Sequence, residues 1–271
     1  MKFNAQKCYI LPTKARSSFL YSLGGVILKQ VQQSPYLGVH ISADLKWSTH
    51  ISDICKRAGS TLGFLQRNLR NCPQECRRLA YISLIRSSLE YGATVWDPYL
   101  KQDVDRLQRV QRQAARFIKR DYRTRETGCV GHVLQELNLP PLQERRKQQR
   151  LTTLYKIVKG QIPAMPPENF LTPADRSRRR IRPTTFKDCS YDNTIARQEI
   201  LNSCGLKIPD SKTELYKNSF FVRTVADWNK LEDTVVTIDS VCIFISSGQS
   251  TTRGCPPTHR QSEQKCFLAS F

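Results

Sequence analysis

The spacing of apolar positions divides the chain into a short extended part and a longer helical part. Residues 1–42 contain short apolar runs bounded by turn residues, namely Cys8–Leu11, Val26–Leu28 and Tyr36–Ile41. Such runs are typical of strands, and the polar Lys29–Pro35 connection between the last two favours a hairpin. Because so short a segment cannot bury both faces of a sheet, we expect these strands to be the edge of a larger one.

From Asp44 onward the apolar residues recur at the three- and four-residue steps of amphipathic helices. Pro73 opens the second of these helices, which ends near Gly92. Each helix carries one apolar stripe, so mutual burial in a three-helix bundle is the simplest arrangement. The three stripes comprise Leu45, Ile51, Ile54, Ala58, Leu62, Leu65 and Leu69, then Leu79, Ile82, Ile85 and Leu89, then Val104, Leu107, Val110, Ala114, Phe117 and Ile118.

Further helices are expected beyond the bundle. His132–Leu137 form a short helix and Leu142–Val158 a longer one. Residues 161–185 are rich in proline and arginine and are expected to form an exposed linker, followed by a last ordered block at Leu215–Leu231. Beyond Asp233 no period persists, which predicts an irregular tail. The predicted fold class is therefore mainly α, with a small β-hairpin, a helical bundle, further helices and an irregular tail.

Charge narrows the possible partners. The 271 residues include 43 Lys and Arg against 23 Asp and Glu, which gives a formal net charge of +20 and a sequence pI near 9.8. Such an excess attracts polyanions, and nucleic acid is the default partner of a basic chain, although an anionic membrane surface could use the same charge. No segment approaches the roughly 20 apolar residues that span a bilayer, and we expect no membrane partner.

The third bundle helix concentrates this charge on the side opposite its apolar stripe. Between residues 101 and 120 there are seven Lys and Arg but only two Asp. A one-signed strip suits a phosphate backbone, whereas the alternative is an ordinary solvated helix face. A second cluster follows on the Leu142–Val158 helix, and Arg178–Arg180 form a third, for which nuclear import is a rival interpretation. The predicted nucleic-acid-binding residues are Arg109, Arg112, Arg116, Lys119, Arg120, Arg145, Arg146 and Lys147.

The spacing of the ten cysteines does not indicate a metal site. They are scattered, and no pair has Cys-x-x-Cys spacing. Cys72 and Cys76 lie one helical turn apart but lack two further ligands. The residues after Met1 have no apolar core of the secretory type, so we expect an intracellular protein, in the cytoplasm, the nucleus or both, with reduced thiols.

Six blocks of the chain follow one known order. They are Phe3–Cys8, Tyr36–Val39, Leu62–Leu69, Leu89–Pro98, Leu107–Phe117 and Ser219–Asn229. In this order they resemble the end of the palm, the thumb and the C-terminal region of reverse transcriptases from LINE (non-LTR) retrotransposons, most closely the jockey-like group. The resemblance covers roughly residues 1–233, and Val222 stands where the last block usually has proline.

The resemblance, together with the loss of period beyond Asp233, divides the chain into four expected parts. Residues 1–42 would be a palm remnant, 43–125 a thumb-like three-helix bundle, 126–233 a helical C-terminal region and 234–271 a disordered tail. Within the first part, the hairpin called the primer grip corresponds to Tyr36, Leu37 and Gly38.

The resemblance also implies what this chain lacks. Reverse transcription needs paired carboxylates that hold two metal ions, and the family supplies them in a Tyr/Phe-Ala-Asp-Asp turn. The sequence contains no adjacent Asp-Asp pair. We therefore expect no catalytic residue, no bound cofactor, although the parent family uses Mg²⁺, and no enzyme activity of the chain as it stands. The expected partner is RNA or an RNA–DNA hybrid, held through its phosphates. The alternatives are an inert transposon relic or a fragment of a longer active reverse transcriptase.

Overall fold

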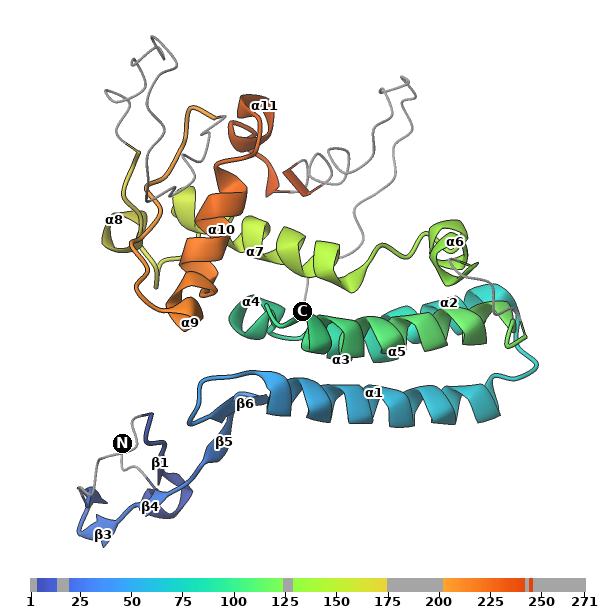
Figure 1. Cartoon of the computed structure of the whole chain (residues 1–271), viewed down its shortest axis with the longest axis horizontal. Coiled ribbons are helices and arrows are strands. Elements are labelled where there is room, and N and C mark those ends of the chain that lie inside the picture. The colour runs from blue at the N-terminus through green and yellow to red at the C-terminus, as the bar shows by residue number, and fades with distance from the viewer. Residues whose placement is uncertain (1–3, 14–19, 124–128, 175–201, 242–243, 246–271) are drawn as a thin grey trace, which may run out of the picture.

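The computed structural model describes residues 4–13, 20–123, 129–174, 202–241 and 244–245 (Figure 1). The described part is mainly helical with small two-stranded sheets, which confirms the predicted fold class. Helix α1 lies along one side of the helical part, the α2–α5 segments form a middle layer, and α7 lies on the other side (Figure 1). The strands extend from the N-terminal end of α1.

The strands form three separate pairs after a short 3₁₀ turn at Ala5–Lys7. Strand β1 (Tyr9–Ile10) pairs in parallel with β4 (Lys29–Gln30), and β2 (Ser22–Leu23) pairs antiparallel with β3 (Val26–Ile27). The third pair is the antiparallel hairpin of β5 (Gln33–Tyr36) and β6 (Val39–Ser42).

The predicted hairpin between Val26–Leu28 and Tyr36–Ile41 is therefore wrong. The second run is not one strand, because the chain reverses inside it at Leu37 and Gly38, whose φ angles are 47° and 81°. Two consecutive residues with positive φ are the geometry of a two-residue hairpin turn. The apolar residues on both sides of Gly38 concealed this turn.

Helix α1 (Ser48–Asn68) begins later than the expected start at Asp44. The Asp44 carboxylate accepts hydrogen bonds from the Ser42 hydroxyl at 2.5 Å and the Lys46 amide at 3.0 Å, which favours a turn in place of a helix. Leu45 consequently has a φ of 55° and is 38% exposed, so it is not part of the buried stripe. The remaining stripe is buried at Ile51, Ile54, Ala58, Leu62 and Leu65.

The second predicted helix is built from α2 (Gln74–Ala80), a π-helical turn (Tyr81–Arg86) and α3 (Ser87–Glu90), followed by α4 (Ala93–Trp96). Its buried positions recur at every fourth residue, at Arg77, Tyr81, Ile85 and Leu89. The wider π turn adds residues per turn and shifts the buried face. Leu79, which the regular period places in the stripe, is 60% exposed as a result.

Helix α5 (Lys101–Lys119) packs on α1 and on α2. Helix α6 (Cys129–Glu136) also packs on α5. The predicted stripe of α5 is confirmed for Leu107, Val110, Ala114, Phe117 and Ile118, which are buried. These helices share one hydrophobic core, which Trp96 and residues 134–142 extend towards α7.

A second core forms around α7 (Leu142–Val158), whose bounds match the prediction. The longer α10 (Phe220–Trp228) and the short α11 (Asp233–Val236) contribute buried residues to it. The short helices α8 (Pro167–Phe170) and α9 (Glu214–Lys217) contact α10. The buried residues of this core are Leu151, Leu154, Tyr155, Leu206, Val225, Trp228, Val235, Val236 and Phe244.

The irregular tail was predicted to begin too early. Residues 235 and 236 are buried in α11, and Phe244 is 3% exposed and stacks on Tyr155 with ring centroids 4.5 Å apart. The segment around Phe244 is too short to show a period in the sequence, yet it packs because Tyr155 offers an aromatic contact. Residues 246–271 of the predicted tail, and residues 175–185 of the predicted linker, lie outside the described residues.

Candidate nucleic-acid interface

The basic face of α5 is the clearest candidate surface. Arg109, Arg112 and Arg120 are exposed, while Arg116 and Lys119 are half-buried. Arg106 and Arg109 lie near Cys55 of α1, where burial, opposed by the nearby guanidinium groups, raises the pKa of that thiol to about 11. The basic face therefore borders α1.

Lys119 is engaged by a carboxylate of the neighbouring helix. Its Nζ lies 2.5 Å from Oε2 of Glu136 on α6, and Oε1 of Glu136 is 3.1 Å from Nδ1 of His132. The hydrogen bond from Lys119 lowers the pKa of Glu136. A phosphate could contact Lys119 only in competition with Glu136.

The second predicted cluster turns inward. Arg146 is 1% exposed and its Nε donates to Oδ1 of Asp97 at 2.8 Å. Arg145 holds both carboxylate oxygens of Glu90, with Nη2 2.8 Å from Oε2, and this hydrogen bonding raises the pKa of Arg145. These two guanidinium groups are internal ion-pair partners of Asp97 and Glu90.

Lys147 occupies an intermediate position. Its side chain is 43% exposed, and Nζ lies 3.6 Å from Oδ1 of Asp227 on α10. Helix α7 packs against α4, α5 and α10, so few of its side chains can reach solvent. This packing is the reason why the basic cluster on α7 faces the interior.

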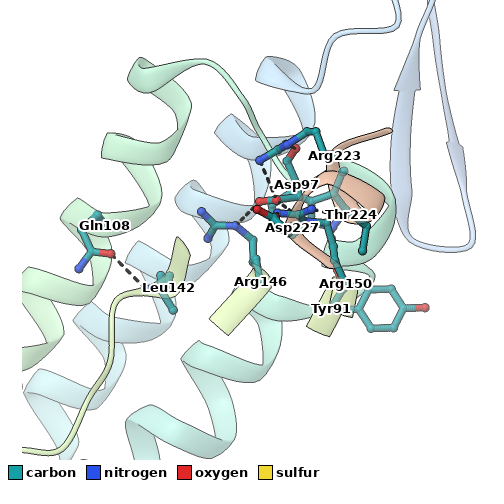
Figure 2. A network of polar contacts seen from close by, with 10 residues as sticks. Tyr91, Asp97, Gln108, Leu142, Arg146, Arg150, Arg223, Thr224 and Asp227 are labelled. Atoms are coloured by element: carbon teal, nitrogen blue, oxygen red, sulfur yellow. Dashed lines mark hydrogen bonds and ion pairs between the residues drawn. The ribbon is translucent and has the colours of Figure 1, made fainter. Parts of the chain in front are cut away.

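Asp97 is the centre of a polar network that the sequence interpretation missed (Figure 2). Its carboxylate accepts from Arg146 and, at 2.9 Å, from Nε of Arg150, and it lies 3.2 Å from Nη2 of Arg223. Arg150 also donates to Oγ1 of Thr224 at 3.2 Å and to Oδ2 of Asp227 at 3.1 Å. The sequence did single out two of these residues, because Asp97 and Arg223 belong to two of the blocks that carry the family resemblance.

The primer-grip-like residues lie at the tip of the β5–β6 hairpin, at the end of the molecule where the strands join α1. Tyr36 is 66% exposed and Leu37 is 76% exposed. Gly38 takes the positive φ that the turn requires. The tip is thus an open apolar surface apart from the basic face of α5.

The acidic side chain of Asp103 on α5 is buried between two helices. Asp103 lies in the first turn of α5, is 1% exposed and accepts a hydrogen bond from Oγ of Ser48 at 2.6 Å. A buried carboxylate that fixes one helix to another has a structural explanation. Within the described ranges, no group of three or more His, Cys, Asp or Glu side chains is placed to hold a metal ion.

None of the helices in the described part combines the length and apolar character needed to cross a bilayer.

The fold and the surface define a mainly helical protein that carries a basic helix and, separately, an apolar hairpin tip. The chain is 27% identical over 157 residues to the probable RNA-directed DNA polymerase from transposon BS of Drosophila melanogaster. The match covers 54% of this chain but 16% of that relative. It supports the predicted reverse transcriptase relationship as a distant and partial one. No family model matches the chain, and no solved structure matches it.

Proposed function

We propose that this chain is the nucleic-acid-holding part of a non-LTR retrotransposon reverse transcriptase and binds RNA or an RNA–DNA hybrid through phosphate contacts. The observation that carries the proposal is the set of exposed arginines on α5. At 1.5 Å per residue, Arg109 to Arg120 span about 16 Å, enough for about four or five phosphates of one strand. Contacts of this kind are independent of base sequence.

The distant relationship and the overall charge support the same proposal. The relative's name describes an RNA-directed DNA polymerase, and this chain matches only 16% of its length. A fragment of a longer active enzyme is therefore the second candidate. We propose that the chain by itself does not polymerise, because its sequence contains no adjacent Asp-Asp pair of the kind that the family uses to hold metal ions. A primer-extension assay of the purified chain with magnesium would contradict this by incorporating nucleotides above background.

Binding is tested by measuring affinity for an RNA–DNA hybrid over a salt series. Each phosphate contact contributes about 0.7–0.9 to the slope of log affinity against log salt. The triple variant Arg109→Gln, Arg112→Gln, Arg120→Gln should lower that slope by about 2–3 and weaken binding at low salt.

The matched control removes equal charge from α1 and the turn that follows it, at Lys56, Arg67 and Arg70, which are also exposed. We expect this control to keep most of the slope. An equal loss in both triple variants would show that only net charge matters, and no binding at any salt would reject the proposed function.

A further inference from the structure

The tip of the β5–β6 hairpin is held by a residue far away in the sequence. Oη of Tyr91, the residue that ends α3, donates to the carbonyl oxygen of Leu37 at 3.1 Å. The same ring covers Gly38, since a Cβ on that glycine would lie 3.3 Å from Cε1 of Tyr91. Both residues of the turn are therefore contacted by one side chain.

The corner that carries Tyr91 is itself fixed to the bundle. Nε1 of the buried Trp96 donates to the carbonyl oxygen of Tyr91 at 2.8 Å. Gly92 takes a φ of 61°, and a Cβ there would lie 3.4 Å from Cγ2 of Val39 in β6. The hairpin and the α3–α4 corner are thus in close contact at two points, where Gly38 meets the Tyr91 ring and where Gly92 meets Val39.

The turn needs such support because its first residue is strained. Leu37 has a φ of 47°, in the left-handed region that a leucine rarely adopts. Its side chain is 76% exposed, so packing of that side chain does not hold the conformation. The Tyr91 hydrogen bond acts on the backbone of this strained residue.

We propose that Tyr91 is the positioning residue of the Leu37–Gly38 turn and sets how Tyr36 and Leu37 are presented to a bound nucleic acid. Figure 2 shows Tyr91 projecting away from the Asp97 network, so its part is separate from that buried cluster. Tyr36 and Tyr91 are 66% and 61% exposed, and exposed aromatic rings are the side chains on which bases stack. The presentation to nucleic acid rests on the proposed function, whereas the positioning of the turn does not.

The positioning is tested by amide hydrogen exchange of the full chain without nucleic acid. Tyr91→Phe removes the hydroxyl and keeps the ring, so exchange across residues 36–40 should rise several-fold while exchange in α1 and α5 stays unchanged. The control Tyr122→Phe alters a tyrosine that is 53% exposed beyond α5 and should change neither region. Unchanged exchange in the turn, or an equal rise throughout the bundle, would overturn the inference.

The functional part is tested by a double-mutant cycle on affinity for an RNA–DNA hybrid. Tyr91→Phe and Tyr36→Ala should each weaken binding several-fold, and the double variant should be no weaker than the worse single variant. Additive losses, or no loss from Tyr91→Phe, would overturn the presentation role. If the unaltered chain binds no nucleic acid, the proposed function and the presentation role fail together, and the exchange result still decides the positioning.

Discussion

At the residue scale, His50 shows how burial alters an ionisable side chain. His50 is 2% exposed, its Nδ1 accepts the backbone N–H of His40 at 3.2 Å, and its ring lies edge-on to Trp96 at 5.2 Å. Burial, with the charges of His40 and Arg57 as smaller causes, lowers the pKa of His50 to about 4. The neutral ring is the form that joins β6 to α1.

This environment predicts a loss of stability in mild acid. The unfolded chain binds a proton at His50 near pH 6.5, and the folded chain resists it until about pH 4. The contribution is therefore complete above pH 6.5 and is lost as the pH falls towards 4. Between pH 7.5 and 5 the free energy of unfolding should fall by about 2 kcal/mol from this group. Urea unfolding at a series of pH values measures it.

The variant His50→Gln should flatten that pH dependence, although its stability at neutral pH will also be lower. His132 is the control because its side chain is 74% exposed. His132→Gln should leave most of the slope in place. A slope that survives in His50→Gln would show that another group is responsible.

At the element scale, periodicity predicted helices well but their faces less reliably. The bounds of α7 and the buried stripe of α5 follow from local spacing alone. The face of the α2–α3 segment did not, since the π turn at Tyr81–Arg86 shifts it and exposes Leu79. A prediction from regular helical spacing does not include such a turn, because π turns are rare single-turn bulges inside α-helices.

The contact between α5 and α6 predicts a variant that binds nucleic acid more tightly. Glu136→Gln removes the carboxylate that holds Lys119, so the ammonium group becomes available to a phosphate. One further contact should raise the salt slope by about 0.7–0.9 and strengthen binding several-fold at low salt. The salt series on an RNA–DNA hybrid is again the measurement.

Glu75→Gln provides the matched control for this prediction. Glu75 is exposed on α2, lies 3.8 Å from Arg78 and carries the same charge. Its replacement should change affinity much less. If both variants gained affinity equally, the effect would come from net charge and not from Lys119.

At the scale of the whole molecule, Asp97 joins the two hydrophobic cores. It follows Trp96 of the first core and accepts from Arg146 and Arg150 of α7 and from Arg223 of α10, beside the second core. The backbone carbonyl of Asp97 also accepts from Nη1 of Arg223 at 3.0 Å. The network brings the Leu89–Pro98 and Ser219–Asn229 blocks into direct contact through Asp97 and Arg223.

Removing this carboxylate should be strongly destabilising. Asp97→Asn leaves two arginines that are about 95% or more buried without their shared counter-charge. Breaking a buried ion pair in this way costs about 3–5 kcal/mol of unfolding free energy. Asp105→Asn, at an exposed position of α5, is the control and should change stability by less than about 0.5 kcal/mol. Chemical denaturation of both variants decides between a central and a minor role.

The sequence alone determined the mainly helical fold class, the α7 bounds and the basic face of α5, because helical period and charge are local properties. Tertiary structure decided which cations remain open. Arg146 and Arg109 are both arginines in basic helical clusters, so the sequence does not separate them. Of the two, only Arg146 forms a hydrogen bond with Asp97, a carboxylate 49 residues away. The turn at Leu37 likewise depends on Tyr91, which lies 54 residues further along the chain. Contacts at such separation exist only once the helices have packed.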